Sequence, residues 1–413
     1  MKSSTTSWMD RYLLRTLRSL LGPIPVALVL RDAEDRPDRD EAIVGTVRIP
    51  DRSTLLSMVM NPEVAFGDAY SAGSIEVEGD LVRALEHVNA SSPRVRNGYW
   101  RLLSKWLDWA QANTRRGSAR NIHQHYDLSN DFYRLWLDRQ MVYTCAYFPT
   151  PDVSLEDAQK AKMELVCRKL GLRPGETVLE AGCGWGSLAI YMARQYNVRV
   201  RAFNISHEQI AWARDAARNA GVSSQVEFIE DDYRNAGGRF DAFCSVGMLE
   251  HVGRENYHEL GRVIHRTIGD TGRGFLHFIG RNRGQPISVW IRRRIFPGAY
   301  APSLRESLEV LEPQNFSVLD IENLRQHYAR TLEHWLARFD ACFDKVVHQY
   351  GMDFARMWRL YLAGSIASFR AGNLQLFQVL FAGSRCRSIP WTREHLYAPL
   401  GEESDPELWT RAM

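Results

Sequence analysis

The sequence predicts an α/β protein, in which a parallel sheet covered by helices follows a small α+β domain. Three observations support this fold class. Between residues 177 and 279, short apolar stretches alternate with longer stretches of helical periodicity. A glycine-rich turn follows the first of these apolar stretches. A polar stretch at Asn113–Ser118 interrupts the helical pattern, so we place a boundary there, between domains at residues 1–117 and 118–413.

The first segment of the chain predicts a helix that lies along a surface. Arg11, Arg15 and Arg18 stand among apolar residues, a pattern typical of an amphipathic interfacial helix. The apolar run Leu20–Leu30 is short, contains two prolines and does not resemble a signal peptide. We therefore expect no transmembrane segment.

Two short strands are expected in the small domain, at Ala42–Ile49 and Ser74–Val77, with helical pieces around them. Together they indicate an α+β module of roughly a hundred residues, which is a usual domain size. The chain contains no internal repeat and no low-complexity segment.

The larger domain begins with a helix and continues as alternating strands and helices. Ser154 and Asp157 resemble a capping box, and the helix they open ends at Gly171. Strands are then expected at 177–179, 198–203, 226–229, 241–246 and 274–279, and helices at 187–195, 207–219 and 256–267. This alternation predicts a parallel sheet covered on both faces, with ligands at the carboxyl ends of its strands.

The C-terminal part is expected to be mainly helical. Apolar residues recur there at helical spacing and form one face: Leu332, Trp335, Leu336, Phe339, Phe343 and Val346. We expect this face to be buried against the sheet; the alternative is that it lines a tunnel for a ligand.

The glycine-rich turn has the form Glu180-x-Gly182-x-Gly184-x-Gly186. It lacks the glycine spacing of a dinucleotide fingerprint and the Lys-Ser/Thr of a phosphate loop. An acidic residue before the first glycine suits a cationic or polyhydroxyl ligand better than a pyrophosphate. S-adenosylmethionine is such a ligand, and the glycines allow the backbone to approach it closely.

Composition and charge exclude fewer classes of function than the motifs do. The chain has 413 residues, which is long for one compact core, with 45% hydrophobic and 24% charged residues. A net charge of +3 gives no reason to expect a nucleic-acid partner. The 6 cysteines are far apart and form no C-x-x-C pair, so we expect reduced cysteines in the cytoplasm and no zinc site. His123 and His125 are expected to be structural, and no metal is predicted.

Further motifs surround the glycine turn and occur in a recognisable order. They are His125–Tyr133, Met141–Phe148, Glu180–Gly186, Ser206–Gln209, Asp232–Arg234, Ser245–Gly253, His277–Gly280, Tyr328–Leu332 and Phe369–Gln378. With them the chain resembles the cyclopropane-fatty-acyl-phospholipid synthase family over nearly all of residues 121–382. Phe66–Tyr70 and Glu78–Leu81 extend the resemblance into the small domain, and the tail Pro390–Tyr397 is similar to a longer subgroup.

The resemblance implies a Rossmann-like class I methyltransferase sheet with helical additions. The implied reaction is methyl transfer from S-adenosylmethionine to a cis double bond of an unsaturated phospholipid acyl chain, followed by loss of a proton and closure of a cyclopropane ring. Some members of the longer subgroup instead make 10-methylene or methyl-branched chains, and related enzymes N-methylate small amines. These two alternatives stay open.

The resemblance also implies the roles of particular residues. Bicarbonate, acting as the base, is expected at Cys145, Glu250, His277, the backbone of Ile279, and Tyr328. The cofactor is expected at Tyr143, Thr144, Glu180, Gly182, Gly184, Trp185, Gly186, Asn204, Ser206, Gln209, Asp232, Tyr233 and Arg234. Thr144 and Asn204 depart from the residues usual in the family, Ser and Thr, and Asn204 leaves the ribose contacts open.

Elementary chemistry is consistent with these roles. An alkene is a weak nucleophile, so the reaction needs a dry pocket and stabilisation of a developing carbocation. His277 and Tyr328 can donate hydrogen bonds to an anion, and Glu250 can accept one from a protonated bicarbonate. Cys145 is expected to contact that anion rather than act as a nucleophile. In the absence of the motifs, each of these residues would be interpreted as structural.

The expected partner surface is a membrane. Arg281, Arg283 and Arg292–Arg294 form a basic cluster that is either a solvated face or a contact for anionic headgroups. Together with the N-terminal helix, this cluster predicts a cytoplasmic protein that associates peripherally with the inner face of the membrane. A homodimer is compatible with the sequence.

Overall fold

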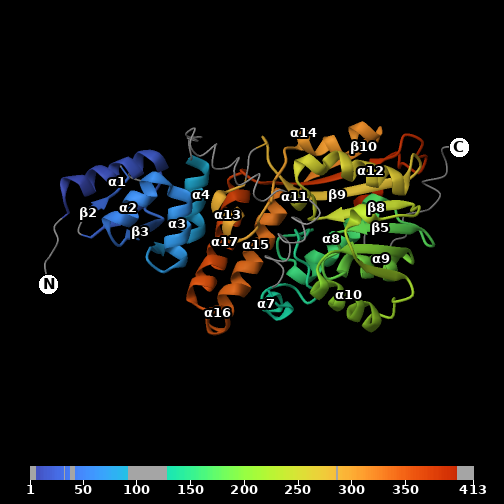
Figure 1. Ribbon diagram of the computed structural model, residues 1–413, viewed down its shortest axis with the longest axis horizontal. Helices are drawn as coiled ribbons and strands as arrows, with labels where there is room; N and C mark the ends of the chain where they lie inside the picture. The colour runs from blue at the N-terminus through green and yellow to red at the C-terminus, as the bar shows by residue number, and fades with distance from the viewer. Residues whose placement is uncertain (1–5, 32, 38–41, 92–127, 285–286, 398–413) are drawn as a thin grey trace.

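The computed structural model describes residues 6–31, 33–37, 42–91, 128–284 and 287–397. A smaller N-terminal part and a larger part lie side by side along the long axis (Figure 1). The expected boundary at 113–118, and both His123 and His125, lie outside the described residues. Within the described ranges, no helix has the length and hydropathy needed to cross a membrane.

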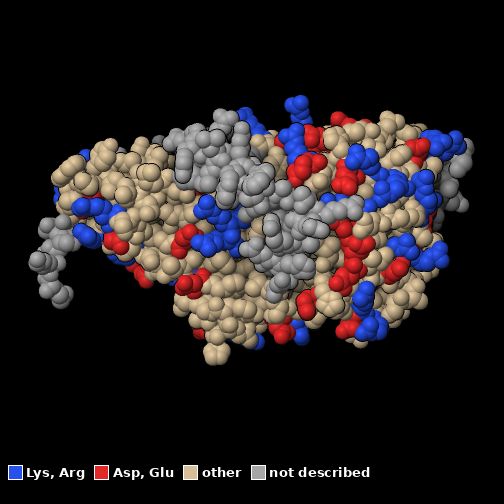
Figure 2. All heavy atoms as spheres, in the orientation of Figure 1, with Lys and Arg blue, Asp and Glu red and all other residues tan. Residues whose placement is uncertain are grey.

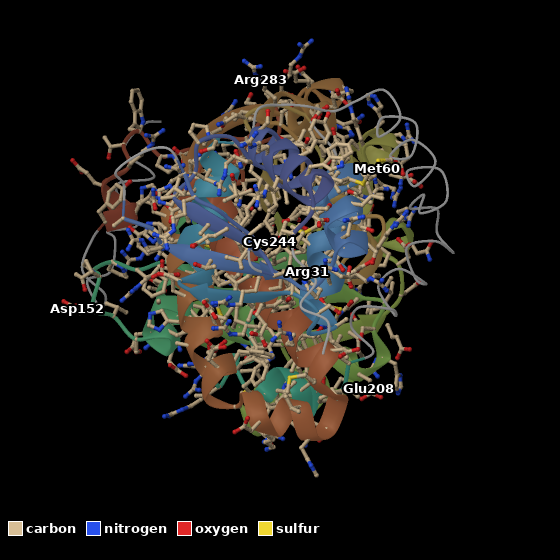
Figure 3. The ribbon with its side chains drawn as sticks, turned by 90° about the vertical axis from the view of Figure 1, so that its left-hand side faces the viewer. Arg31, Met60, Asp152, Glu208, Cys244 and Arg283 are labelled. Atoms are coloured by element: carbon tan, nitrogen blue, oxygen red, sulfur yellow. The ribbon has the colours of Figure 1, made fainter. Side chains whose placement is uncertain are left out.

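The N-terminal part is a four-stranded sheet with helices packed on it. The strands are β1 (Val26–Leu30), β2 (Ala33–Asp35), β3 (Gly45–Ile49) and β4 (Glu76–Gly79), in the order β2-β1-β3-β4. The helices are α1 (Trp8–Leu21), α2 (Arg52–Met60), α3 (Pro62–Ser71) and α4 (Leu81–Ser91). The two expected strands, β3 and β4, are present, and Figure 3 views this part from its outer end.

The segment around Leu20–Leu30 is not one element. Helix α1 ends at Leu21, Gly22 follows with φ 77°, and β1 starts at Val26. The expected helix is therefore present, but β1 was not predicted, because the apolar run contains the end of one element and the whole of the next. The apolar face of α1 is buried through Leu14 and Leu17 in the core of this part.

The larger part is built on a seven-stranded sheet in the order β10-β11-β9-β8-β5-β6-β7. Five parallel strands form its centre and one edge: β5 (Thr177–Ala181), β6 (Arg199–Asn204), β7 (Val226–Glu230), β8 (Ala242–Val246) and β9 (Arg273–Gly280). Helices α8 (Leu155–Leu170), α9 (Ser187–Tyr196) and α10 (His207–Asn219) share one core cluster with this sheet, and α12 (Tyr257–Ile268) lies in another. The predicted fold class is confirmed.

The first of these helices shows how local sequence sets the boundaries. The hydroxyl of Ser154 accepts a hydrogen bond from the Asp157 amide, and Gly171 ends the helix in the left-handed conformation with φ 57°. The carboxylate of Asp157 accepts from the Ser154 hydroxyl rather than from its backbone amide. The cap is therefore one-sided rather than the full capping box expected.

Two strands in the C-terminal part were not predicted. β10 (Ser317–Asn323) and β11 (Gln375–Ala382) extend the sheet, and β11 pairs antiparallel with both β10 and β9. Every residue of β11 is buried. Its sequence has apolar residues on both faces and two glutamines three residues apart, Gln375 and Gln378, so it lacks the alternation that identifies a half-buried strand.

Helices α15 (Arg325–Ala341), α16 (Phe343–Tyr350) and α17 (Met352–Arg370) form a layer between the sheet and the N-terminal part (Figure 1). The expected apolar face is buried at four positions and partly buried at Leu336 and Phe343; Phe343 and Val346 belong to α16 because α15 ends at Ala341. Expected burial against the sheet is wrong for most of this face, since α15 packs chiefly on α17. The described residues also form short α-helices: α7 (Asn130–Arg134), α11 (Leu249–Val252), α13 (Val289–Arg294), α14 (Leu304–Ser307) and α18 (Glu394–Tyr397).

The two parts share an extensive interface. The Arg356 guanidinium on α17 donates to the carbonyls of Tyr70, at 2.6 Å, and Ile75, at 2.8 Å. The Trp290 indole on α13 donates to Asp68 at 3.1 Å, and a Cβ at Gly67 would overlap that indole ring. Helices α3 and α4 therefore dock directly onto the layer that borders the site.

Candidate active site

A pocket of about 120 Å³ lies at the carboxyl ends of β5, β6 and β8. Eight residues predicted for cofactor binding line it: Tyr143, Thr144, Glu180, Gly182, Gly184, Trp185, Asn204 and Gln209. A larger, open hollow of about 480 Å³ is lined by Thr177, Asp241 and their neighbours and contains none of the predicted residues. The smaller pocket is the candidate site, because it holds the glycine turn.

The three glycines of the turn serve different purposes. Gly182, Gly184 and Gly186 have φ values of 81°, 54° and 83°. A Cβ at Gly186 would lie 2.6 Å from the Phe228 ring, so this glycine is required for packing. A Cβ at Gly184 would meet no described atom within 4 Å, which leaves its backbone open toward the pocket.

Glu180 places a buried carboxyl group in the pocket wall. It is 2% exposed, and its Oε2 has no hydrogen-bond partner among the described residues. Burial raises the pKa of this carboxyl group from 4.5 to about 8. An unpartnered buried carboxyl group is costly unless a ligand supplies a donor or a cation, so this residue fits the charged end of S-adenosylmethionine.

The side chain of Asn204 is hydrogen-bonded within the site and to the glycine turn, so its amide protons are not free to bind a ligand. Its side-chain amide donates to the Gly184 carbonyl at 3.2 Å and to Gln209 Oε1 at 2.7 Å. The Nε2 of Gln209 has no partner among the described residues and remains available as a donor. Ser206 is buried and caps α10, so its oxygen is occupied by the Gln209 amide.

Asp232, Tyr233 and Arg234 do not line the pocket. The Arg234 guanidinium pairs with Asp232 at 2.8 Å and lies 5.7 Å from the centre of the Tyr233 ring. These contacts order the segment after β7. Cofactor contact by these three residues stays a prediction.

A well-anchored segment, residues 141–144, forms another wall of the pocket. Met141 has a φ of 58°, a strained conformation for a residue that is not glycine. Gln159 Nε2 donates to the Thr144 carbonyl, and Lys162 Nζ donates to the Thr144 hydroxyl, both at 2.8 Å. Tyr143 shares a hydrogen bond of 2.8 Å with the Tyr361 hydroxyl.

Three of the five residues predicted for an anion lie beside this pocket: Glu250 follows β8, and His277 and Ile279 lie on β9. Glu250 Oε1 accepts a hydrogen bond of 2.5 Å from the Ile279 amide, and its Oε2 has no partner among the described residues. Burial raises the pKa of Glu250 from 4.5 to about 7. The Ile279 amide is therefore held by Glu250, and the second carboxyl oxygen is the group left for a ligand.

His277 is buried as a neutral imidazole. Desolvation holds its pKa well below the ordinary value, and Gln378 Nε2 donates to its Nδ1 at 3.1 Å. Because Nδ1 accepts, the ring proton lies on Nε2, which has no partner among the described residues. His277 therefore presents an unused N–H donor.

Cys145 is fully buried, and its thiol lies 3.2 Å from the Ala146 carbonyl and 4.0 Å from that of Leu324. Burial raises the pKa of the thiol, so it is not a thiolate nucleophile. The Tyr328 amide donates to the same Leu324 carbonyl at 3.1 Å. The Cys145 thiol therefore lies near the start of α15, the helix that carries Tyr328.

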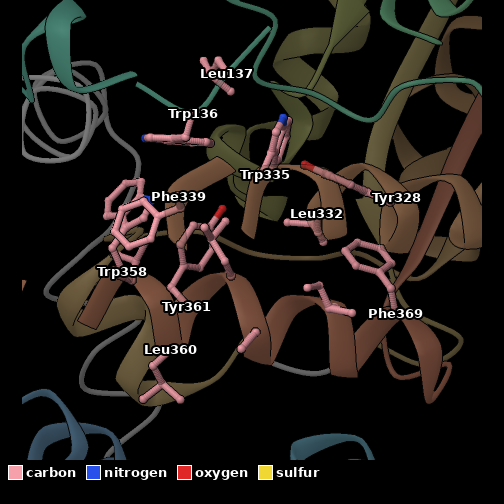
Figure 4. Packing of buried hydrophobic residues seen from close by; sticks show 14 of the residues in the cluster. Trp136, Leu137, Tyr328, Leu332, Trp335, Phe339, Trp358, Leu360, Tyr361 and Phe369 are labelled. Carbon is pink, nitrogen blue, oxygen red and sulfur yellow. The ribbon is translucent and has the colours of Figure 1, made fainter. Parts of the chain in front are cut away.

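Aromatic rings enclose the side of the site that faces the helical layer. Figure 4 shows Trp335 and Phe339 of α15 in one cluster with Trp358 and Tyr361 of α17. The Tyr143 ring lies 5.3 Å from Trp136 and 5.2 Å from Trp335. This wall is apolar and rich in π-faces, which attract positive charge.

Comparison with known proteins decides the family. The model of the mycolic acid cyclopropane synthetase family matches residues 113–379. The chain belongs to this family. A probable fatty acid methyltransferase of Pseudomonas putida is 34% identical over 359 residues, covering 83% of this chain and 89% of the relative. The cyclopropane-fatty-acyl-phospholipid synthase of Escherichia coli K12 is 40% identical over 260 residues, covering 63% of this chain and 66% of the relative.

Solved structures agree with the family. The mycolic acid cyclopropane synthase CmaA1, in a complex with SAH and CTAB, superimposes with a TM-score of 0.61 and 31% identity, covering 64% of this chain and 97% of that one. As a member of the cyclopropane synthetase family, the chain is an S-adenosylmethionine-dependent methyltransferase.

Two polar residues of this family member were missed by the sequence interpretation: Lys162 and Gln378. Each is buried, and each bonds to a predicted site residue: Lys162 to Thr144, 18 residues away, and Gln378 to His277. The signal for Lys162 was a lysine among the apolar residues of a helix. Gln378 gave no comparable signal, because its partner on β9 lies 101 residues away.

The expected basic cluster is divided in the structure. Arg292 is buried, and Arg294 forms an ion pair of 3.0 Å with Asp68 of the N-terminal part. Arg283 and Arg293 are exposed. Figure 2 shows basic and acidic side chains interspersed over the larger part on the face in view. The interpretation of all five arginines as one headgroup contact is therefore wrong for Arg292, which is buried.

Proposed function

We propose that this enzyme methylates the cis double bond of an unsaturated phospholipid acyl chain and closes a cyclopropane ring, with bicarbonate as the base. The observation that carries the proposal is the pair of unused polar atoms beside the cofactor pocket. Glu250 Oε2 and His277 Nε2 are both buried and both without a partner among the described residues. Such atoms indicate a small polar ligand.

The chain's own residues have distinct tasks in this scheme. S-adenosylmethionine, when bound, supplies the methyl group. Glu180, the glycine turn and Gln209 would hold it, and the predicted contacts from Ser206 and Asp232–Arg234 extend the binding region beyond the pocket. The rings of Tyr143, Trp136 and Trp335 exclude water and stabilise positive charge on the acyl chain, at about 0.5–2 kcal/mol per desolvated face.

Bicarbonate fits the polar atoms of the site that have no partner among the described residues. The neutral His277 donates from Nε2 to an anionic oxygen, and the hydroxyl of Tyr328 is a second predicted donor. Glu250, with a pKa near neutrality, exchanges a proton with the bound anion. A fixed carboxylate beside a carbocation would risk alkylation, so a small, exchangeable base is better suited to remove the proton.

The names of two relatives are consistent with the second product class as well. They are named a probable fatty acid methyltransferase in Pseudomonas putida and a tuberculostearic acid methyltransferase in Mycobacterium tuberculosis. A 10-methylene or methyl-branched product remains the alternative, because it requires the same methyl transfer. The similarity to coclaurine N-methyltransferase, at 21% identity, concerns the fold alone.

We further propose that residues 1–117 form a domain that brings this enzyme to the cytoplasmic face of an anionic membrane. Trp8, Arg11, Tyr12 and Arg15 share one face of α1 at helical spacing, and all four are exposed. An exposed face that combines aromatic and basic side chains suits a lipid headgroup region.

Incubation with methyl-labelled S-adenosylmethionine and unsaturated phospholipid vesicles tests the acceptor. We expect label in the acyl chains, less of it in buffer freed of carbon dioxide, and recovery when bicarbonate is added. Cofactor binding without any labelled acyl product would rule out the lipid acceptor. Equal labelling with and without bicarbonate would rule out only the base. Turnover of small amines instead of lipids would favour N-methylation.

A further inference from the structure

Lys162 is the unusual group in the cofactor pocket. It lies on α8, is 2% exposed and lines the pocket together with Glu180. Its Nζ donates to the Thr144 hydroxyl at 2.8 Å, and it forms no ion pair with any carboxylate of the described residues. The nearby Asp138 is occupied by the backbone amides of Gln140 and Val142.

A buried ammonium with one neutral partner is costly, since it has three protons to donate and has lost its water. Two of those protons have no acceptor in the described part of the chain. Glu180 shows the complementary situation, with Oε2 unpartnered in the same pocket. The pocket thus holds one buried acid and one buried base that are not bonded to each other.

The cofactor of this enzyme carries the opposite arrangement at its amino-acid end: an ammonium and a carboxylate. We propose that Lys162 is a positioning residue that directs the carboxylate of the cofactor's methionine moiety to the Thr144 wall, while Glu180 takes the ammonium. This inference rests on S-adenosylmethionine binding and is independent of the acyl acceptor.

The hydrogen bond to Thr144 gives Lys162 a second effect. An ammonium can only donate, so the Thr144 oxygen is an acceptor in this contact. The proton of the Thr144 hydroxyl must then point to another acceptor. Because Thr144 lines the pocket, this proton is available to an anionic ligand oxygen. Lys162 therefore contributes positive charge and fixes the hydroxyl as a donor.

Binding of two ligands distinguishes a specific contact with the amino-acid end of the cofactor from a general structural role of Lys162 in the pocket. S-adenosylhomocysteine carries the amino-acid end, whereas 5′-methylthioadenosine lacks it. In the Lys162→Met variant, we expect calorimetry to show affinity for S-adenosylhomocysteine lower by about tenfold or more, the usual effect of losing a charge-assisted hydrogen bond. Affinity for 5′-methylthioadenosine should be unchanged. Lys160→Met, an exposed change on the same helix, is the matched control and should alter neither affinity.

Thr144→Val keeps the shape of the side chain, removes the hydroxyl and provides the test if Lys162→Met does not fold. It should also weaken S-adenosylhomocysteine selectively, and its effect should not add fully to that of Lys162→Met. Equal losses for both ligands, or no loss for S-adenosylhomocysteine, would overturn the inference. Wild-type protein that binds the ligand but methylates no lipid would contradict the proposed function and leave this inference standing.

Discussion

Two buried carboxyl groups at the site, Glu180 and Glu250, have pKa values raised by the same physical cause. Both are cut off from water, and each has one oxygen without a partner among the described residues. Their surroundings give them different tasks. Glu180 lines the cofactor pocket, where a cationic ligand suits it, whereas Glu250 is tied to the end of β9 by the Ile279 amide.

The burial of Glu250 predicts a pH dependence of stability. Its pKa is 4.5 in the unfolded chain and about 7 in the folded one, so the folded state keeps a proton that the unfolded state releases. The contribution of Glu250 to the free energy of unfolding is fully present below pH 4.5 and is lost as the pH rises through 7. Compared with Glu250→Gln, the wild type should lose an additional amount on the order of 3 kcal/mol between about pH 4 and pH 9. Parallel profiles in urea unfolding would contradict this.

The hydrogen bond from Gln378 sets the tautomer of His277, which leads to a testable prediction. Glutamate at this position would accept from Nδ1 instead of donating to it, so the ring proton would move away from Nε2 or the ring would become charged. We expect Gln378→Glu to lower product formation roughly tenfold or more, since proton transfer by a positioned group contributes about 10²–10⁴-fold. Affinity for S-adenosylhomocysteine should stay the same. Full activity in this variant would show that the tautomer of His277 has no role.

At the scale of elements, the glycine turn joins β5 to α9 and requires glycine for two reasons. Gly184 and Gly186 both have positive φ, but only Gly186 is closely surrounded. Gly184→Ala should cost about 1–2 kcal/mol for the left-handed conformation alone. Gly186→Ala should cost about 3 kcal/mol or more, because its Cβ would also overlap the Phe228 ring. Urea unfolding of both variants measures this; a smaller loss for Gly186→Ala would be inconsistent with the packing described.

The elements also show what the sequence could predict and what it could not. Strands β5 to β9 follow from apolar stretches between helices, and the turn at Glu180–Gly186 follows from its glycines. β11 could not be predicted, because its apolar residues lie on both faces and its two glutamines, Gln375 and Gln378, are three residues apart, so apolar and polar residues do not alternate. Lys162 was missed for another reason: its role depends on contact with Thr144 and on sharing a pocket with Glu180, and only the tertiary structure shows that these residues lie together. Local patterns predict elements, whereas the partners of buried polar groups are a property of the tertiary structure.

At the scale of the whole molecule, the N-terminal part carries the apolar side chains that suit a lipid surface. Trp8 is 77% exposed, Tyr12 63% and Met60 67%, while the rest of α1 is anchored by the buried Leu14 and Leu17. This part docks on α13 and α17, which belong to the region around the aromatic wall. A membrane contact there would bring the helical layer close to its lipid substrate.

This arrangement predicts a local effect on vesicle binding. The double substitution Trp8→Ser and Tyr12→Ser should lower co-sedimentation with anionic vesicles roughly tenfold, because two aromatic rings no longer enter the interface. Trp391→Ser is the matched control, since Trp391 is 82% exposed but lies in the C-terminal tail. Added salt should weaken binding of the wild type. Equal losses in both variants would place the contact elsewhere.

The structure of the product tests the central claim most directly. Purified enzyme, [methyl-¹³C]S-adenosylmethionine and vesicles of a cis-unsaturated phospholipid are incubated together, and the acyl chains are examined by NMR. The site described here predicts that the labelled carbon becomes the CH₂ of a cyclopropane ring, bonded to both former alkene carbons. A labelled exocyclic methylene or a labelled methyl branch, with no ring carbon, would contradict it.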